Sequence, residues 1–195
     1  MWYSRLASAV QQFTNAPPET SLYGSGWDVI WLGHCGERWD RSKSSLQYPD
    51  DSRISPDGYI GWKEASFEVI RDNHRLIRWA AGPICTFAYA VTSTGSRKIL
   101  SLADKGRSTA FDTELSELCL FGGLKCITVS PQLFMHYVPS SDGKSASEID
   151  RENKHKEVPV DDGDLDLVMG QTQNIVKSAR CMAMFGKSCI PGSHN

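Results

Sequence analysis

WDVIWLG, the segment at residues 27–33, decides the fold class of this 195-residue chain. Apart from Asp28, every residue between its first tryptophan and its glycine is apolar. A short apolar run that ends in glycine is typical of a strand buried on both faces, as in a parallel sheet. The residues YGSG at 23–26 come directly before it and indicate a turn into the strand. We therefore expect an α/β protein.

A strand followed by a helix is predicted further along the chain. Residues 87–92 alternate large and small side chains and end at a cluster of Thr, Ser and Gly. Residues 94–104 have the spacing of an amphipathic helix, and Thr94 is its candidate cap. A strand that leads into a helix is the unit from which α/β folds are built.

The N-terminal residues and the centre of the chain each predict another helix. Residues 1–13 carry Leu6, Val10 and Phe13 at helical spacing. Residues 109–120 carry an apolar stripe at helical spacing, made by Phe111, Leu115, Leu118 and Cys119. Two glycines end that helix, and residues 125–129 follow as a strand. Cys119 and Cys126 flank this turn and are candidates for a disulfide with a short loop.

Polar segments separate these elements. Residues 37–58 are predicted to be a long surface loop, and residues 59–80 fit either short strands or a helix. Residues 142–166 are acidic and poor in apolar side chains, which indicates a linker or an exposed arm. Residues 174–190 regain apolar side chains and are expected to dock as a helix, with Cys181 and Cys189 as a candidate clamp.

Composition limits the classes of function. Charged residues make up 23% of the chain and the net charge is -2, so the sequence has no basic footprint for nucleic acid. No segment approaches the roughly 20 apolar residues of a membrane span. The N-terminus is too polar for a secretory signal. The six cysteines fit either three disulfides or a set of buried thiols, and sequence alone does not choose between fifteen pairings.

Five residues are candidates for chemistry. Asp112 and Glu114 lie at the start of a predicted helix. Two carboxylates at this spacing can hold a cation on an extended backbone, but on a helix they point about 200° apart. The alternative is that Asp112 stabilises the helix N-terminus through the helix dipole. His34 and Glu37 follow the first strand, where ligands of open α/β sheets bind. His136 follows the last strand as a candidate metal ligand. For each histidine the alternative is a structural or surface role.

Several ordered segments of the chain resemble glycosyltransferase family 25 of the fungal type, the family of lipopolysaccharide and collagen galactosyltransferases. These segments are WDVIWLGHCGE at 27–37, CTFAYAVT at 85–92, GSRKIL at 95–100, FDTEL at 111–115, PQLF at 131–134 and NIVKSARC at 174–181. The resemblance covers most of residues 1–190 and corresponds to the C-terminal portion of the family's domain.

The resemblance implies a partial GT-A-like fold without its N-terminal strands. It divides the chain into a transferase portion at residues 1–138, an acidic linker at 139–173 and a cysteine-containing tail at 174–195. It implies a UDP-sugar donor, transfer of a hexose, most commonly galactose, to a hydroxyl of a glycan or protein acceptor, and a Golgi location for the full-length form. Asp112 matches a family aspartate that contacts the acceptor or acts as a base.

The resemblance also implies a divalent metal, Mn²⁺, held by an acidic motif that we do not find in residues 1–26. Two hypotheses follow. The chain is part of an active hexosyltransferase, or it is a truncated or degenerate transferase domain that binds a glycan or a protein. An unrelated α/β domain is the third alternative.

Overall fold

The computed structural model describes residues 2–17, 21–55, 58–59, 65–103 and 110–135, together with Ala183 and Gly186. The chain divides into two units, residues 1–135 and 136–195. The elements below belong to the first unit. The predicted linker at 139–173, nearly all of the tail at 174–195, and His136 lie outside the described residues.

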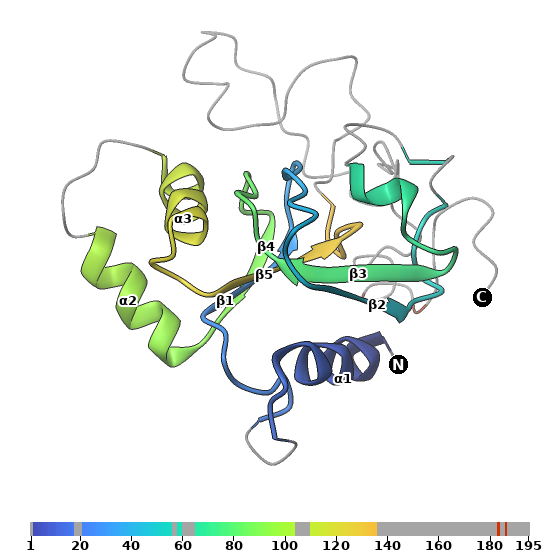
Figure 1. Ribbon diagram of the computed structural model, residues 1–195, viewed down its shortest axis with the longest axis horizontal. Coiled ribbons are helices and arrows are strands. Elements are labelled where there is room, and N and C mark those ends of the chain that lie inside the picture. The colour runs from blue at the N-terminus through green and yellow to red at the C-terminus, as the bar shows by residue number, and fades with distance from the viewer. Residues whose placement is uncertain are drawn as a thin grey trace, which may run out of the picture. The chain divides into compact units, whose positions relative to one another are not determined.

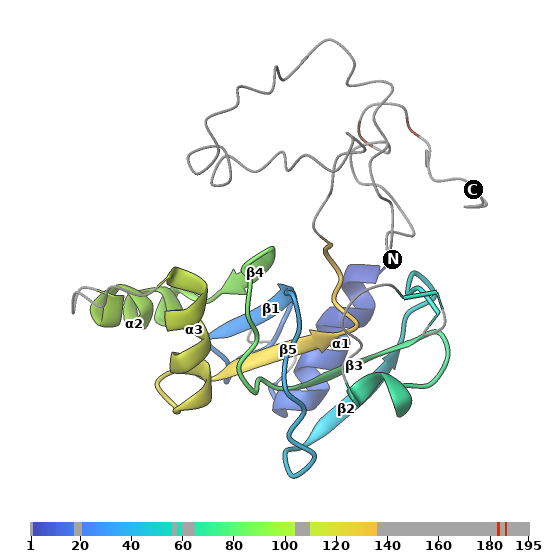
Figure 2. The same ribbon diagram turned by 90° about the horizontal axis from the view of Figure 1, so that it is seen from above.

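A mixed sheet of five strands forms the centre of the first unit, so the predicted α/β class is confirmed. Its strand order is β2-β3-β5-β1-β4, which Figure 2 shows from above. β1 and β5 run parallel, and the other neighbouring pairs run antiparallel. The bounds are β1 Val29–Gly33, β2 Ser45–Pro49, β3 His74–Trp79, β4 Ala88–Val91 and β5 Cys126–Ser130.

β1 lies between β5 and β4 and is covered on both faces. Val29, Ile30 and Trp31 are at most 1% exposed. Ile30 packs in the core on one side of the sheet, while Val29 and Trp31 pack in the core on the other. The continuous apolar run arises because side chains of a strand alternate between faces and both faces here are covered.

Helix α1, Trp2–Thr14, covers one face of the sheet, as predicted for residues 1–13. Leu6, Ala9 and Val10 share one side of the helix and are almost fully buried. They pack in one core with strand residues such as Ile77 and Val129. Figure 1 shows α1 on the side of the sheet opposite α3.

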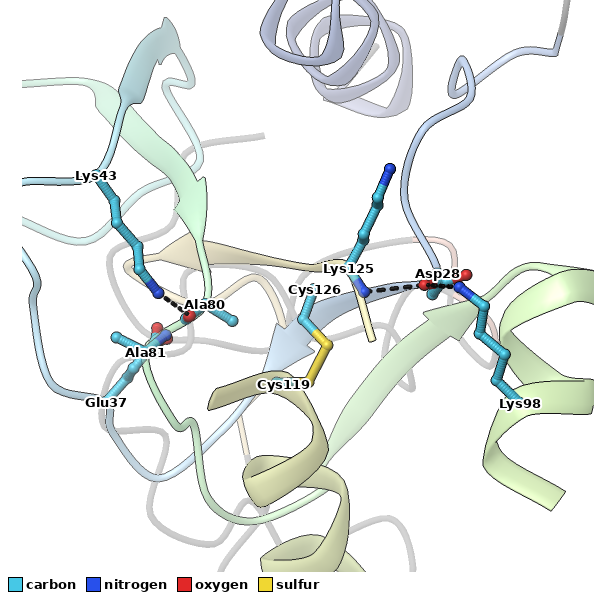
Figure 3. Close-up of a disulfide and its surroundings, with 9 residues drawn as sticks. All are labelled: Asp28, Glu37, Lys43, Ala80, Ala81, Lys98, Cys119, Lys125 and Cys126. Carbon is cyan, nitrogen blue, oxygen red and sulfur yellow. Dashed lines mark hydrogen bonds and ion pairs between the residues drawn. A yellow bond between two sulfur atoms is a disulfide. The ribbon is translucent and has the colours of Figure 1, made fainter. Parts of the chain in front are cut away.

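Helices α2, Ser93–Ala103, and α3, Phe111–Leu120, lie on the other face. Leu115 and Cys119 of α3 are buried against β1 and β5. The predicted disulfide between Cys119 and Cys126 is present and joins α3 to β5 (Figure 3). Phe111 is 44% exposed, so the predicted stripe was wrong at its first position. Phe111 is the first residue of α3, and its ring contacts the exposed ring of Tyr89 in β4.

The cap of α2 is Thr92 rather than Thr94, so that prediction was wrong. The hydroxyl of Thr92 accepts the backbone N–H of Gly95 at 2.9 Å. β4 leads into the helix almost directly, which moves the cap into the end of the predicted strand. Gly95 is required because a side-chain Cβ there would lie 2.4 Å from the carbonyl oxygen of Asp28.

Residues 37–58 were predicted to be a surface loop, and this was wrong in part. They contain β2, and they bury Tyr48, Asp50 and Arg53. The polar character of the segment hid the strand because Asp50 is buried as an ion pair with Arg75 of β3, at 2.6 Å. Residues 59–80 contain the short helix η1, Ala65–Glu68, and β3. No helix in the described part of the chain is long and apolar enough to cross a membrane.

Candidate functional site

The carboxyl ends of β1 and β5 meet at one edge of the sheet because the two strands are parallel. We call the residues at this place the carboxyl edge: His34 and Cys35 after β1, and Gln132 after β5. β4 runs antiparallel to β1, so the segment before β4 reaches the same edge with Cys85. Open α/β sheets bind their ligands outside the carboxyl ends of parallel strands. The carboxyl edge is therefore the place to look for a site.

Asp112 reaches the carboxyl edge from the first turn of α3. Its Oδ2 accepts the backbone N–H of Cys85 at 3.1 Å. Its Oδ1 accepts the N–H of Thr113 at 2.9 Å, and the side chain is half-buried. The helix has no side-chain cap at Ala110. A carboxylate at this position stabilises the helix N-terminus, so the structural interpretation of Asp112 holds alongside any chemical one.

A disulfide between Cys35 and Cys85 joins the end of β1 to the segment before β4, whose Cys85 N–H binds Asp112. The same two segments share a backbone bridge, in which the N–H of Cys35 donates to the carbonyl of Ile84 at 2.8 Å and the N–H of Ile84 donates to Gly36 at 3.3 Å. Cys85 has a φ of 65°, in the left-handed region. Nothing in the sequence distinguished this pairing from the others.

Aromatic side chains border Asp112. Phe111 and Tyr89 lie in contact, with ring centroids 6.2 Å apart, and each is about two-fifths exposed, at 44% and 39%. Phe87 is 38% exposed and packs at the end of β1, where a Cβ on Gly33 would approach the Phe87 Cβ to 3.0 Å. Tyr89 rests in turn on the buried Trp31, at 6.5 Å. A half-exposed carboxylate thus lies beside an exposed aromatic surface.

His34, predicted to bind substrate, lies at the carboxyl edge but is fully buried. Its Nε2 donates to the carbonyl of Val129 at 3.2 Å. Its own carbonyl accepts the side-chain amide of Gln132 at 3.3 Å, and that amide also donates to the hydroxyl of Tyr59 at 2.9 Å. In this structure the His34 side chain offers no surface to a ligand and braces the end of β1.

Glu37, also predicted to bind substrate, forms a buried ion pair. Its Oε2 lies 3.0 Å from Nη2 of Arg78. Its Oε1 accepts the N–H of Ala81 (Figure 3). Arg78 lies opposite Thr128 of β5, and its Nη2 also lies 3.5 Å from the Ser130 hydroxyl at the carboxyl end of β5. Both predicted substrate-binding side chains are thus buried and engaged in structural contacts.

A second buried ion pair supports the carboxyl edge. Arg75 binds Asp50 through Nε at 2.6 Å and donates through Nη1 to the carbonyl of Gln132 at 2.8 Å. Burial raises the pKa of Asp50, but hydrogen bonds from Ser52 and the charge of Arg75 outweigh it and hold that pKa below its usual value of 3.8. Asp50 is therefore a charged structural group that links β2 and β3 to the residues after β5.

The described residues do not fit the divalent metal that the resemblance implies. Asp112 and Glu114 point to different sides of α3, and Glu114 is 8% exposed. Among the described residues no three His, Cys, Asp or Glu side chains gather in a way that could hold a metal ion. His136, the predicted metal ligand, lies outside those residues, so its role stays a prediction.

Sequence reasoning located Asp112 but missed its setting. Cys85, Tyr89 and Gln132 gave no local signal, although the position of Gln132 just after a parallel strand could have drawn attention to it. Asp50 looked like a loop charge because burial is not visible in the sequence. Family models, curated proteins and solved structures all give no match to this chain.

Proposed function

We propose that this chain is the C-terminal portion of a GT-A-like glycosyltransferase of the family 25 type. In its full-length form this enzyme would transfer a hexose, most commonly galactose, from a UDP-sugar to a hydroxyl of a glycan or protein acceptor. The setting of Asp112 carries the proposal. The carboxylate is half-exposed and binds the N–H of Cys85, whose disulfide partner Cys35 follows the carboxyl end of β1, the kind of place where ligands of α/β sheets bind.

Asp112 has the chemistry of an acceptor-binding group or a general base. As the acceptor oxygen attacks the anomeric carbon, its proton moves to the carboxylate and the bond from that carbon to the UDP oxygen breaks. A positioned carboxylate contributes about 10²–10⁴-fold in such steps. The N–H groups of Cys85, at 3.1 Å, and of Thr113, at 2.9 Å, would hold the two oxygens of Asp112 in place, and a carboxylate oxygen has a second lone pair that can accept the acceptor hydroxyl.

The aromatic surface formed by Tyr89 and Phe111 supports a sugar as the ligand. A pyranose ring has an apolar C–H face and a polar rim of hydroxyls, so aromatic rings pack on the former while a carboxylate accepts from the latter. Phe111 directly precedes Asp112, and the ring of Tyr89 lies 6.2 Å from the ring of Phe111. The two kinds of contact that a sugar needs are therefore neighbours on the surface. We derive no step through a metal, since the described residues do not supply its ligands.

Binding and turnover test the proposal separately. UDP and UDP-galactose are titrated into the full chain by calorimetry with and without Mn²⁺, and release of UDP is followed in the presence of galactose-terminated and glucose-terminated acceptors. We expect Asp112→Asn to lower the rate about 10²-fold or more. Asp51→Asn, which changes an exposed carboxylate elsewhere, is the matched control. Absence of UDP-sugar binding together with absence of acceptor binding would contradict the proposal.

A non-catalytic module that binds a glycan is the second candidate, and the exposed Tyr89 and Phe111 favour it equally. The same titrations separate the two. Acceptor binding that is lost in Phe111→Ala but unchanged in Asp112→Asn, without any UDP-sugar binding, would support the module. The two disulfides at Cys35–Cys85 and Cys119–Cys126 support the secretory pathway as the proposed location of either form.

A further inference from the structure

The two disulfides of the described residues differ in their exposure to solvent. Cys119 and Cys126 are 7% and 3% exposed and lie in the core between α3 and the sheet. Cys35 is exposed and Cys85 is half-buried. Thiol–disulfide exchange requires a thiolate to reach one of the two sulfur atoms, so access decides which bridge reacts. The Cys35–Cys85 bridge is the accessible one of the pair.

The Cys35–Cys85 bridge is also coupled to the candidate site. Cys85 donates its N–H to Asp112 at 3.1 Å, so whatever fixes the Cys85 backbone fixes the hydrogen bond to this carboxylate. The φ of 65° at Cys85 is unfavourable for a residue with a side chain, and such a conformation persists only where surrounding contacts hold it. The disulfide to Cys35 is one of those contacts, together with the backbone bridge between Gly36 and Ile84.

We propose that the Cys35–Cys85 disulfide is a reducible bridge that sets the position of the Asp112 carboxylate. A dithiol in solvent attacks Sγ of Cys35 and displaces the Cys85 thiolate, which takes up a proton. The second thiol of the reagent then closes on the mixed disulfide and releases Cys35 as a thiol. The bridge gains two electrons and two protons, and the dithiol becomes a disulfide.

Reduction removes one of the constraints that keep Cys85 in the left-handed region. Its backbone can then relax to a negative φ, which turns the N–H away from Asp112. The carboxylate loses a fixed donor, and the start of α3 loses its connection to β1. This coupling does not depend on the proposed transfer reaction, because it concerns hydrogen bonds that are present without any ligand. Only its effect on activity rests on the proposed function.

The first measurement is graded reduction of the full chain, followed by alkylation and peptide mass spectrometry. We expect Cys35 and Cys85 to be alkylated at a dithiol concentration about tenfold lower than Cys119 and Cys126. The core disulfide is therefore an internal control within the same molecule. Labelling of all four cysteines together, or of Cys119 and Cys126 first, would overturn the proposal.

The second measurement is amide hydrogen exchange on the partly reduced protein. Peptides that span residues 82–87 and 110–114 are expected to lose protection when the Cys35–Cys85 bridge opens, while peptides of β5 keep theirs. Asp112→Ala with the bridge intact is expected to reproduce the loss at Cys85. Unchanged exchange in both peptides after selective reduction would refute the coupling, even if the bridge itself proved accessible.

Variants complete the test. Cys35→Ser/Cys85→Ser is expected to show the raised exchange without reagent and no further change when the dithiol is added. If this variant does not fold, graded reduction of the unmodified chain still decides the question. The failure of these experiments is distinguishable from failure of the proposed function, because neither labelling nor exchange requires a UDP-sugar or turnover.

Discussion

The ion pair between Glu37 and Arg78 tests how burial changes the contribution of an ion pair to the free energy of unfolding. The Glu37 Oε2 and Arg78 Nη2 atoms are 3.0 Å apart, and the two side chains are 0% and 2% exposed. Arg5 and Asp51 form an ion pair at the same distance, 3.0 Å, with side chains that are 44% and 80% exposed. The chain thus contains two pairs of equal length in opposite environments.

We expect Glu37→Ala to destabilise the protein by about 3–5 kcal/mol, because it removes the carboxylate that is paired with the buried charge of Arg78. It also removes the acceptor for the Ala81 N–H. Asp51→Ala removes an exposed partner and should cost about 1 kcal/mol or less. Domains of this kind are stable by about 5–15 kcal/mol, so the first change removes a large share of the total.

Urea unfolding followed by tryptophan fluorescence measures both variants. With a slope of about 2 kcal/mol per molar urea, Glu37→Ala should lower the midpoint by about 1.5–2.5 M and Asp51→Ala by about 0.5 M or less. The double variant Glu37→Leu/Arg78→Met should recover most of the loss, since replacing both charges leaves none unpaired. Equal shifts for Glu37→Ala and Asp51→Ala would refute the argument from burial.

Three further changes probe the frame around the site. Asp50→Asn removes the charge that is paired with Arg75 and should cost about 3–5 kcal/mol at pH 7. The pKa of Asp50 is lowered in the fold, so the wild type keeps this stability above about pH 3.9 and loses it as the pH falls through the folded pKa. The unfolding curves of the wild type and the variant should therefore converge in acid. Gly95→Ala places a Cβ 2.4 Å from the Asp28 carbonyl oxygen and should lower the free energy of unfolding, measured by thermal unfolding, by about 1–3 kcal/mol. An unchanged stability would show that α2 shifts freely. Thr92→Ala should cost about 1 kcal/mol through loss of the helix cap, whereas Thr94→Ala should cost much less; the reverse order would return the cap to Thr94.

Local pattern was a good guide where an element's environment is uniform. The apolar run at 27–33 predicted β1, since a strand covered on both faces needs apolar side chains at every position. Helical spacing predicted α1 and α3 for the same reason. The pattern failed for β2 because Asp50, which directly follows the strand, made the segment look polar, although Asp50 is buried in an ion pair with Arg75 of β3. A sequence window that contains one partner of such a pair reads as a surface loop.

The candidate site was only partly visible in the sequence. Asp112 was found as an acidic residue at a helix start, and the helix does begin there. His34 and Glu37 were found by the rule that ligands bind after strands, yet both side chains are buried in hydrogen bonds and ion pairs. A rule based on position along a strand does not say which side chains turn inward.

The sequence by itself determined the main elements, because periodic burial and turn residues act over a few neighbouring positions. It also indicated the Cys119–Cys126 bridge, whose ends are seven residues apart across one turn. Only the tertiary structure decided the pairing of Cys35 with Cys85, which lie 50 residues apart. It also decided the hydrogen bond from Cys85 to Asp112. The physical reason is that such contacts form when separate segments are placed against the same sheet edge, and no short stretch of the chain contains the information about both.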